Sequence, residues 1–364
     1  MTDQSTKPSA SAQNPPADTA PNGAHKAGRG RPRADWLKGE GAEPLRRNLG
    51  LVGVLIILVI IGIITRPELY GDGTWVKNNT FTILQQASAI GVVTVGMTFV
   101  IIGGGIDLSV GAIIALAGVW STTLATQSYG AVGMIFTALV VGIAVGLVNG
   151  VLISYGRLVP FIATLAMMVA ARGLAAQISG KQTQVSTNAT INSIATTKLL
   201  GIPLLVIILG VVVAAGWVLL NRTTFGRRTV AVGGNTEAAR LAGINVRWHT
   251  VLLYALSGLC CGIAAIMLTS QATSAQAAMA NLYELDAIAA AIIGGTLLSG
   301  GRGTIIGALF GVLVFSTITN LFAINNLSTE VQNMVKGGII VAAVLVQQFR
   351  YKSLTSLLGR KTSS

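Results

Sequence analysis

The sequence predicts an all-α fold: a polytopic membrane protein with about ten transmembrane helices and with both the N and C termini cytoplasmic. Three observations lead to this prediction. Of the 364 residues, 52% are apolar and only 10% are charged, whereas soluble domains carry roughly 25% charged residues. The mean hydropathy is +0.69, and the apolar residues gather in runs close to the roughly 20 residues that a spanning helix needs. This composition excludes soluble enzymes and nucleic-acid-binding proteins.

The N-terminal segment, residues 1–48, differs in composition from the rest of the chain. It holds six of the nine prolines and eight basic residues, and so polar a segment cannot bury enough apolar surface to fold. We therefore expect a disordered cytoplasmic tail. The apolar run that follows, residues 49–65, is interpreted as a membrane anchor and not as a cleaved signal peptide, because no small-residue cleavage site comes after it.

Further apolar runs define the predicted transmembrane domain, residues 49–350, which is followed by a cytoplasmic C-terminal tail at 351–364. The expected spans are 49–65, 82–102, 110–127, 130–154, 161–179, 201–220, 249–270, 287–299, 304–323 and 333–349. Ten spans return the chain to its starting side. In this arrangement 19 Lys and Arg residues lie in cytoplasmic segments and four in external ones, which is the bias expected of cytoplasmic loops.

A glycine-rich segment, GGGIDLSVG at residues 103–111, joins two predicted spans without a conventional polar loop. Each glycine disfavours helix by about 1 kcal/mol relative to alanine, so the backbone should unwind here. Unwound backbone at membrane depth is typical of transport paths. Two interpretations stay open: the segment lines a substrate path or gate, or Asp107 simply caps the next helix. The candidate path residues are Gly103, Gly104, Gly105, Asp107 and Ser109.

A second segment, GGTLLSGGRG at residues 294–303, repeats this arrangement of glycines before an apolar helix. The likeness hints at an internal repeat of the kind that transporters use. Its LSGG sequence also occurs in nucleotide-hydrolysing cassettes, but the chain has no GxxxxGK[ST] phosphate loop, so we expect no ATP binding through it. Glycines spaced four apart, at 142–150, 258–262 and 307–311, predict close helix packing.

Two other features lie inside predicted spans. Arg172 either extends outward to the membrane surface or lines an aqueous vestibule on the transport path, and both interpretations stay open. The adjacent Cys260 and Cys261 match neither a disulfide framework nor a metal-binding spacing, so we interpret them as small apolar residues. No metal site and no cofactor is predicted.

The longest predicted cytoplasmic loop, residues 221–248, contains a short helix. Residues 236–243 read TEAARLAG, with Glu237 in the first turn, where a negative charge complements the helix dipole. Gly243 is the expected C-terminal stop. Because arginines surround it, this helix could lie on anionic lipid or contact a partner protein.

Four segments, in order, resemble the permease subunits of bacterial ribose-type ABC monosaccharide importers. They are GGGIDLSVG at 103–111, PFIATLAMMVAARGLA at 160–175, TTFGRRTVAVGGNTEAARLAGINV at 223–246 and ELDAIAAAIIGGTLLSGGRGTIIGA at 284–308. The likeness covers most of residues 75–350. It implies a multi-pass transport subunit of the bacterial inner membrane, not an enzyme. The implied partners are a cytoplasmic ABC ATPase subunit, an external sugar-binding protein, a second permease copy or paralogue, and membrane lipid.

The resemblance also assigns a role to the helix in the cytoplasmic loop. Glu237, Ala238, Ala239 and Gly243 match the E-A-A-x-x-x-G signature of import permeases, which implies that they form the coupling helix that docks on the ATPase. The I-x-L-P sequence that often follows this signature is absent from the chain.

The transported solute stays open at this point. The resemblance implies a pentose or hexose, and an ABC permease for nucleosides or branched-chain amino acids is the alternative within the same class. An ion-coupled secondary transporter is the alternative from another class. Such a transporter ordinarily needs paired intramembrane carboxylates, and the predicted spans and the glycine-rich segment offer only Asp107.

Overall fold

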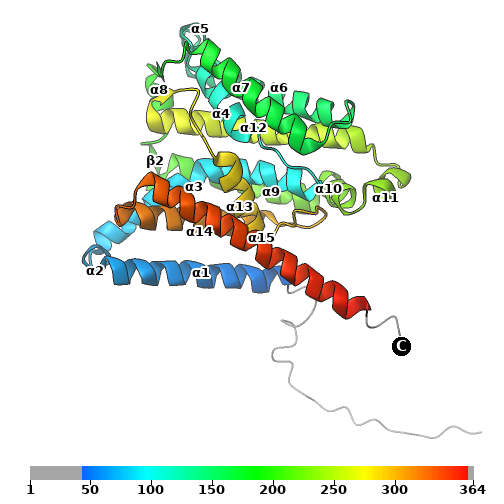
Figure 1. The fold of residues 1–364 in the computed structure, drawn as a ribbon. Coiled ribbons are helices and arrows are strands. Elements are labelled where there is room, and N and C mark those ends of the chain that lie inside the picture. Colours follow the sequence, from blue (N-terminus) through cyan, green and yellow to red (C-terminus); the bar gives the residue numbers. More distant parts are fainter. Residues whose placement is uncertain (1–42, 360–364) are drawn as a thin grey trace, which may run out of the picture.

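The computed structural model describes residues 43–359 and confirms an almost wholly helical protein. Two sheets of very short antiparallel strands are the exception in this part of the chain: β1 (Gln184–Val185) pairs with β4 (Ser274–Ala275), and β2 (Lys198–Leu199) pairs with β3 (Ile202–Pro203). The longer helices run side by side along one common direction (Figure 1). This is the architecture of a multi-pass membrane protein.

The described residues form long and short helices. The long helices are α1 (Glu43–Thr65), α3 (Gly73–Ile102), α6 (Gly130–Ser154), α7 (Pro160–Ile178), α9 (Leu204–Arg222), α12 (Val246–Ala272), α14 (Ile305–Ile324) and α15 (Thr329–Gly359). The short helices are α2 (Pro67–Tyr70), α4 (Val110–Ser121), α5 (Leu124–Gln127), α8 (Ala189–Ser193), α10 (Thr224–Gly234), α11 (Thr236–Leu241) and α13 (Tyr283–Ile293).

The predicted count of ten spans is not confirmed. Within residues 43–359, seven helices are long and apolar enough to cross a membrane: α1, α3, α6, α7, α9, α12 and α14. The predicted spans 110–127 and 287–299 correspond to α4 and α13, which have 12 and 11 residues. At 1.5 Å per residue each is about 17 to 18 Å long, whereas the hydrocarbon core is about 30 Å thick. Beyond α4 the first run continues through a turn into the short helix α5, and beyond α13 the second continues into irregular backbone.

Helix α12 lies at the centre of the bundle, between α6 and α3 (Figure 1). Glycines allow this close approach: a Cβ on Gly142 would collide with Gly258 O, and a Cβ on Gly146 would collide with Tyr254 O. A Cβ on Gly311 would likewise collide with Ala290 O of α13. The predicted packing role of these glycines is confirmed, because only backbones without side chains can come so close.

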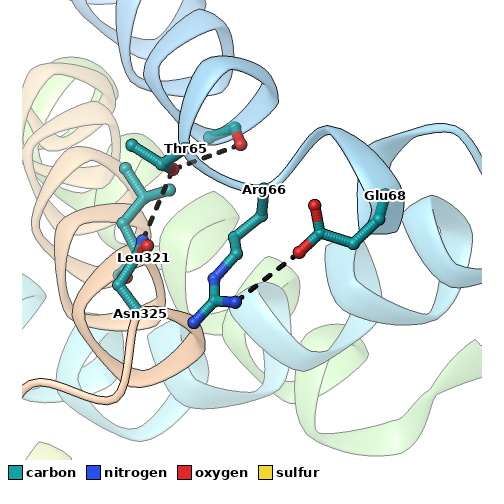
Figure 2. Close-up of polar contacts among 6 residues, drawn as sticks. Thr65, Arg66, Glu68, Leu321 and Asn325 are labelled. Atoms are coloured by element: carbon teal, nitrogen blue, oxygen red, sulfur yellow. Dashed lines mark hydrogen bonds and ion pairs between the residues drawn. The ribbon is translucent and has the colours of Figure 1, made fainter.

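Helix α1 lies at the side of the bundle against α14 and is held at both ends (Figure 1). At one end, Asn325 Nδ2 donates to Thr65 Oγ1 at 3.5 Å, and Arg66 pairs with Glu68 of α2 at 3.5 Å (Figure 2). At the other end, Arg47 Nη1 donates to Gly295 O at 3.0 Å. The N-terminal helix is therefore bonded to the second glycine-rich segment.

The boundaries of the predicted tails differ from the structure. Helix α1 begins at Glu43, so residues 43–48 are helical and do not belong to a disordered tail. Helix α15 extends to Gly359 and includes most of the predicted C-terminal tail. Residues 1–42 and 360–364, on which the rest of both predictions falls, lie outside the described residues.

Candidate transport path and coupling site

The backbone unwinds where the glycines predict it. Residues 103–109 are non-helical between α3 and α4, and Gly104 has a φ of +85°, a conformation that glycine adopts at no steric cost. Two side chains fix the segment by donating to Ile106 O: Tyr254 Oη at 3.2 Å and Thr164 Oγ1 at 3.4 Å. The segment is held in one conformation by α12 and α7.

Asp107 is completely buried at the centre of a hydrogen-bond network. Its Oδ1 accepts from the backbone N–H and the hydroxyl of Ser109, at 3.0 and 2.6 Å, and its Oδ2 accepts from Ser257 Oγ at 3.0 Å. Ser109 Oγ in turn accepts from Asn149 Nδ2 at 2.8 Å. The carboxylate therefore ties the glycine-rich segment to α6 and α12.

The structure also defines the geometry at the start of α4. Ser109, not Asp107, is the N-cap residue, and its side chain makes no capping hydrogen bond. Asp107 accepts from the N–H two residues ahead, which is an Asx-turn leading into the helix. Asp107 thus orders the entrance to α4 without being its N-cap.

The glycine-rich segment borders a cavity that also touches the coupling loop. Gly103, Gly104 and Gly105 line this cavity of about 120 Å³. Residues of α10, α11 and α12 also line it, among them Val232, Thr236, Thr250, Leu253 and Tyr254. The candidate path and the candidate coupling site are adjacent in space.

The two glycine-rich segments meet each other and α10. Gly301 N donates to Ile102 O at 2.8 Å. A Cβ on Gly300 would lie 2.8 Å from Gly233 O and 3.1 Å from Gly104 Cα, and a Cβ on Gly233 would collide with Ile102 O. We name this backbone contact of Gly104, Gly233, Gly300 and Gly301 the glycine junction. The sequence showed two similar segments but gave no signal that α10 joins them.

The short helix predicted within residues 221–248 is confirmed as α11. Asn235 Oδ1 caps it by accepting from Ala238 N at 2.9 Å, and Gly243, with a φ of +83°, ends it. Figure 1 shows α10 and α11 at the end of the bundle opposite α5 and α8. Of the four candidate coupling residues, Ala239 is buried against the protein, whereas Glu237, Ala238 and Gly243 are exposed.

The exposed face of α11 carries two features that the signature did not predict. Glu237 forms an ion pair with Arg240 at 2.7 Å, and both side chains are largely exposed. Leu241 is 83% exposed. Single exposed apolar side chains are common on protein surfaces, so Leu241 alone does not identify a partner site.

Arg172 is half-buried, and its guanidinium is bonded to backbone carbonyls of the protein. Its Nη1 donates to Ala277 O at 2.7 Å and contacts Met279 O at 3.4 Å, both in the irregular segment before α13. The buried Glu284 of α13 lies near it across α4: a Cβ on Gly111 would lie 2.6 Å from Glu284 Oε2 and 3.5 Å from Arg172 Nη2. We name Gly111, Arg172 and Glu284 the Arg172 cluster.

Glu284 and Asp286, in the first turn of α13, were not among the predicted site residues. The predicted span began at residue 287, but α13 begins at Tyr283 and its first turn is inside the protein. Glu284 is buried, and Asp286 pairs with Lys336 of α15 at 3.2 Å. The expectation that only Asp107 is available as an intramembrane carboxylate therefore does not hold, because Glu284 is also buried. The lack of a second such carboxylate no longer argues against an ion-coupled transporter.

Comparison with known proteins resolves the class of transporter. The family described as the permease component of the branched-chain amino acid transport system matches residues 79–344. The chain belongs to this permease family. The ribose import permease of Bacillus subtilis strain 168 is 42% identical over 308 residues, which are 84% of this chain and 94% of that protein.

Two further relatives resemble this chain to a similar degree. The ribose import permease of Escherichia coli strain K12 is 38% identical over 83% of this chain and 94% of its own length. The L-arabinose ABC transporter permease of Azospirillum brasilense is 36% identical over 85% of this chain and 90% of its own length. No solved structure matches the chain. Because the family and these relatives are permeases, this chain is a multi-pass transport subunit and not an enzyme.

Proposed function

We propose that this protein is the permease subunit of an ATP-driven ABC importer that moves a monosaccharide, a pentose or hexose, across the bacterial inner membrane. The observation that carries the proposal is its identity of 38 to 42% over more than four fifths of the chain to permeases named for ribose import. The matching family is named for branched-chain amino acids, so these are the competing substrates.

The proposed energy source is a separate ATPase that binds the exposed face of α11. Glu237, Arg240 and Leu241 present one ion pair and one exposed apolar side chain at the end of the bundle. An external sugar-binding protein would deliver the solute at the opposite end, where α5 and α8 lie (Figure 1). A second permease copy or paralogue and membrane lipid would cover the exposed apolar faces.

The glycine junction supplies a route from the ATPase to the path. Helix α11 follows α10 directly, and Gly233 of α10 contacts both glycine-rich segments through backbone atoms. Backbone atoms in direct contact cannot slide past each other without moving the segments to which they belong. ATP binding that shifts α11 would therefore shift residues 103–105 and 294–301, and would favour one access state over the other.

The proposed path includes Gly103, Gly104, Gly105, Asp107, Ser109 and Arg172. In the described conformation Asp107 and Ser109 are fully buried. They act by fixing the unwound segment, which would move away from α6 and α12 when the path opens. Arg172 would contact the solute itself.

Uptake by reconstituted complexes tests the proposal. The permease is placed in liposomes with its ATPase, and a loaded binding protein presents labelled ribose, arabinose or galactose, with leucine as the competing substrate. We expect ATP-dependent accumulation of one of the sugars and none of leucine. Accumulation of leucine alone, or of sugar without ATP, would contradict the proposal.

A further inference from the structure

Two members of the Arg172 cluster, Gly111 and Glu284, are buried in the protein, and Arg172 is half-buried. Arg172 is about 18 Å along α7 from Pro160 and about 9 Å from Ile178, at 1.5 Å per residue. Glu284 is in the first turn of the half-length helix α13, and Gly111 is in the first turn of the half-length helix α4. Three helices thus bring a cation, an anion and a bare backbone position together inside the membrane domain.

The two charged groups face each other with atoms that have no partner. Arg172 Nη2 and Glu284 Oε2 are both buried, and neither has a hydrogen-bond partner among residues 43–359. Only 7% of Glu284 is exposed. Polar groups buried inside a membrane protein are costly unless they are bonded, and charged ones mark substrate pathways.

The backbone beside the cluster is irregular and strained. Residues 276–282 separate β4 from α13, and within them Ala280 and Leu282 have φ values of +55° and +67°. Side chains other than glycine rarely adopt this conformation, which persists at binding sites where the surroundings enforce it. The same segment presents the carbonyls of Ala277 and Met279 to Arg172.

Another ion pair on the same helix shows how a purely structural pair is built. Asp286, two residues after Glu284, bonds Lys336 at 3.2 Å, and the two side chains are 15% and 19% exposed. Lys336 also lies over the Phe315 ring, 5.3 Å from its centroid. These charges satisfy each other, whereas Arg172 Nη2 and Glu284 Oε2 have no hydrogen-bond partner among the described residues.

We propose that the Arg172 cluster is the contact site for hydroxyl groups of the transported sugar inside the membrane. Glu284 Oε2 accepts a hydrogen bond from one hydroxyl, and Arg172 Nη2 donates one to the same or the neighbouring hydroxyl. One positive and one negative group together suit a neutral solute that carries both donors and acceptors. Gly111 leaves the surface of α4 bare at this point, where a side chain would obstruct the solute.

This proposal rests on the proposed function, and it adds a requirement for movement. A Cβ on Gly111 would collide with Ala280 O, so α4 now packs directly on the segment before α13. The sugar enters when α4 and this segment separate. The glycine junction can drive this movement, because Gly104 precedes α4, and Gly300 and Gly301 follow α13.

The test uses the reconstituted importer and whichever of ribose, arabinose or galactose the wild type accumulates. Binding protein is saturating, so that delivery does not limit uptake. We expect Glu284→Gln and Arg172→Gln each to lower sugar uptake about tenfold, the equivalent of about 1.4 kcal/mol. Copurification of the ATPase and its basal hydrolysis should stay at wild-type levels. Asp286→Asn is the matched control on the same helix and should keep wild-type uptake in every assembled complex.

The charge-swapped double variant, Arg172→Glu with Glu284→Arg, separates a sugar site from a structural ion pair. A structural pair would recover uptake on swapping, whereas a sugar site would stay defective because the donor and the acceptor have exchanged places. Recovery of uptake, or wild-type uptake by either single variant, would overturn the proposal. If the single variants fail to assemble, Glu284→Asp and Arg172→Lys are measured in their place, with full uptake by both as the contrary result. A wild type that accumulates none of the three sugars would instead contradict the proposed function.

Discussion

The glycine junction and the Arg172 cluster both lie beside non-helical backbone, but they differ in whether the polar groups there are hydrogen-bonded. At the junction, backbone atoms of residues 102–104, Gly233 and residues 300–301 touch, and Gly301 N donates to Ile102 O. At the cluster, Arg172 Nη2 on α7 and Glu284 Oε2 on α13 lie beside an irregular segment and have no hydrogen-bond partner among the described residues. The comparison teaches that irregular backbone within a membrane can either join moving parts tightly or present polar groups to a solute, depending on whether its hydrogen bonds are closed.

The largest loss of uptake is expected from a substitution that disrupts the glycine junction. In Gly233→Ala the new Cβ would collide with Ile102 O and lie 2.8 Å from Gly301 N, so backbone must shift on both sides. We expect sugar uptake to fall about tenfold or more, which corresponds to about 1.4 kcal/mol or more in the rate-limiting barrier. Uptake per ATP hydrolysed in proteoliposomes measures it.

The adjacent glycine is the matched control for this change. Gly234 ends the same helix, and a Cβ built on it would meet nothing within 4 Å. Gly234→Ala should therefore keep uptake within about twofold, because it alters helix propensity in the same way without the collision. Equal loss in both variants would mean that the junction does not transmit movement.

A second prediction concerns the network that holds the first glycine-rich segment. Asp107→Ala removes the acceptor for Ser109 and Ser257, which stay buried. We expect the free energy of unfolding in detergent to fall by about 2 to 5 kcal/mol, because leaving buried partners unbonded is more costly than the bonds themselves. Asp107→Asn keeps one acceptor oxygen and should lose less. If Asp107→Asn were stable but abolished uptake, Asp107 would contact the solute directly.

A third prediction concerns α11 and the coupling of ATP hydrolysis to uptake. Gly243→Ala strains a residue with a φ of +83° and should turn the end of α11, at a local cost of about 1 kcal/mol. Gly243→Ala and Glu237→Ala should each uncouple ATP hydrolysis from uptake while the complex stays assembled. Normal sugar transport per ATP in both single variants would exclude α11 as the coupling element.

The smallest expected effect is on stability at the same helix. Glu237 pairs with Arg240 three residues ahead, and about 70% of each side chain is exposed. Exposed pairs of this kind contribute about 0.3 to 0.5 kcal/mol. Glu237→Gln should therefore leave the thermal midpoint of the solubilised protein nearly unchanged. A large destabilisation would show that Glu237 acts within this chain and not at a partner.

Local patterns predicted much of the fold. Runs of apolar residues located the long helices, the three consecutive glycines located the break after α3, and Gly243 located the end of α11. Each of these depends on residues close together in the sequence. Both α4 and α13 were counted as spans, although they are too short to cross a membrane, because an apolar run has the same composition whether it is one helix or a helix followed by irregular backbone.

The candidate site was predicted only in part for the same reason. Glu284 read as a polar residue before a span, because nothing in its neighbourhood shows that Arg172, on a different helix, faces it across Gly111. The junction of Gly104, Gly233 and Gly300 likewise depends on contacts between distant segments. Such contacts follow from tertiary packing, and no periodicity in one sequence encodes them.

The half-length helices bear on how the chain is made. A segment as short as α4, with 12 residues, cannot hold its own place in a bilayer, since about 20 apolar residues are needed. During synthesis α4 must therefore stay beside α3 until later helices are made. Asp107 gains its bond from Ser257 only when the ribosome has added 150 more residues. The centre of this protein is therefore completed late in biosynthesis, by the arrival of α12.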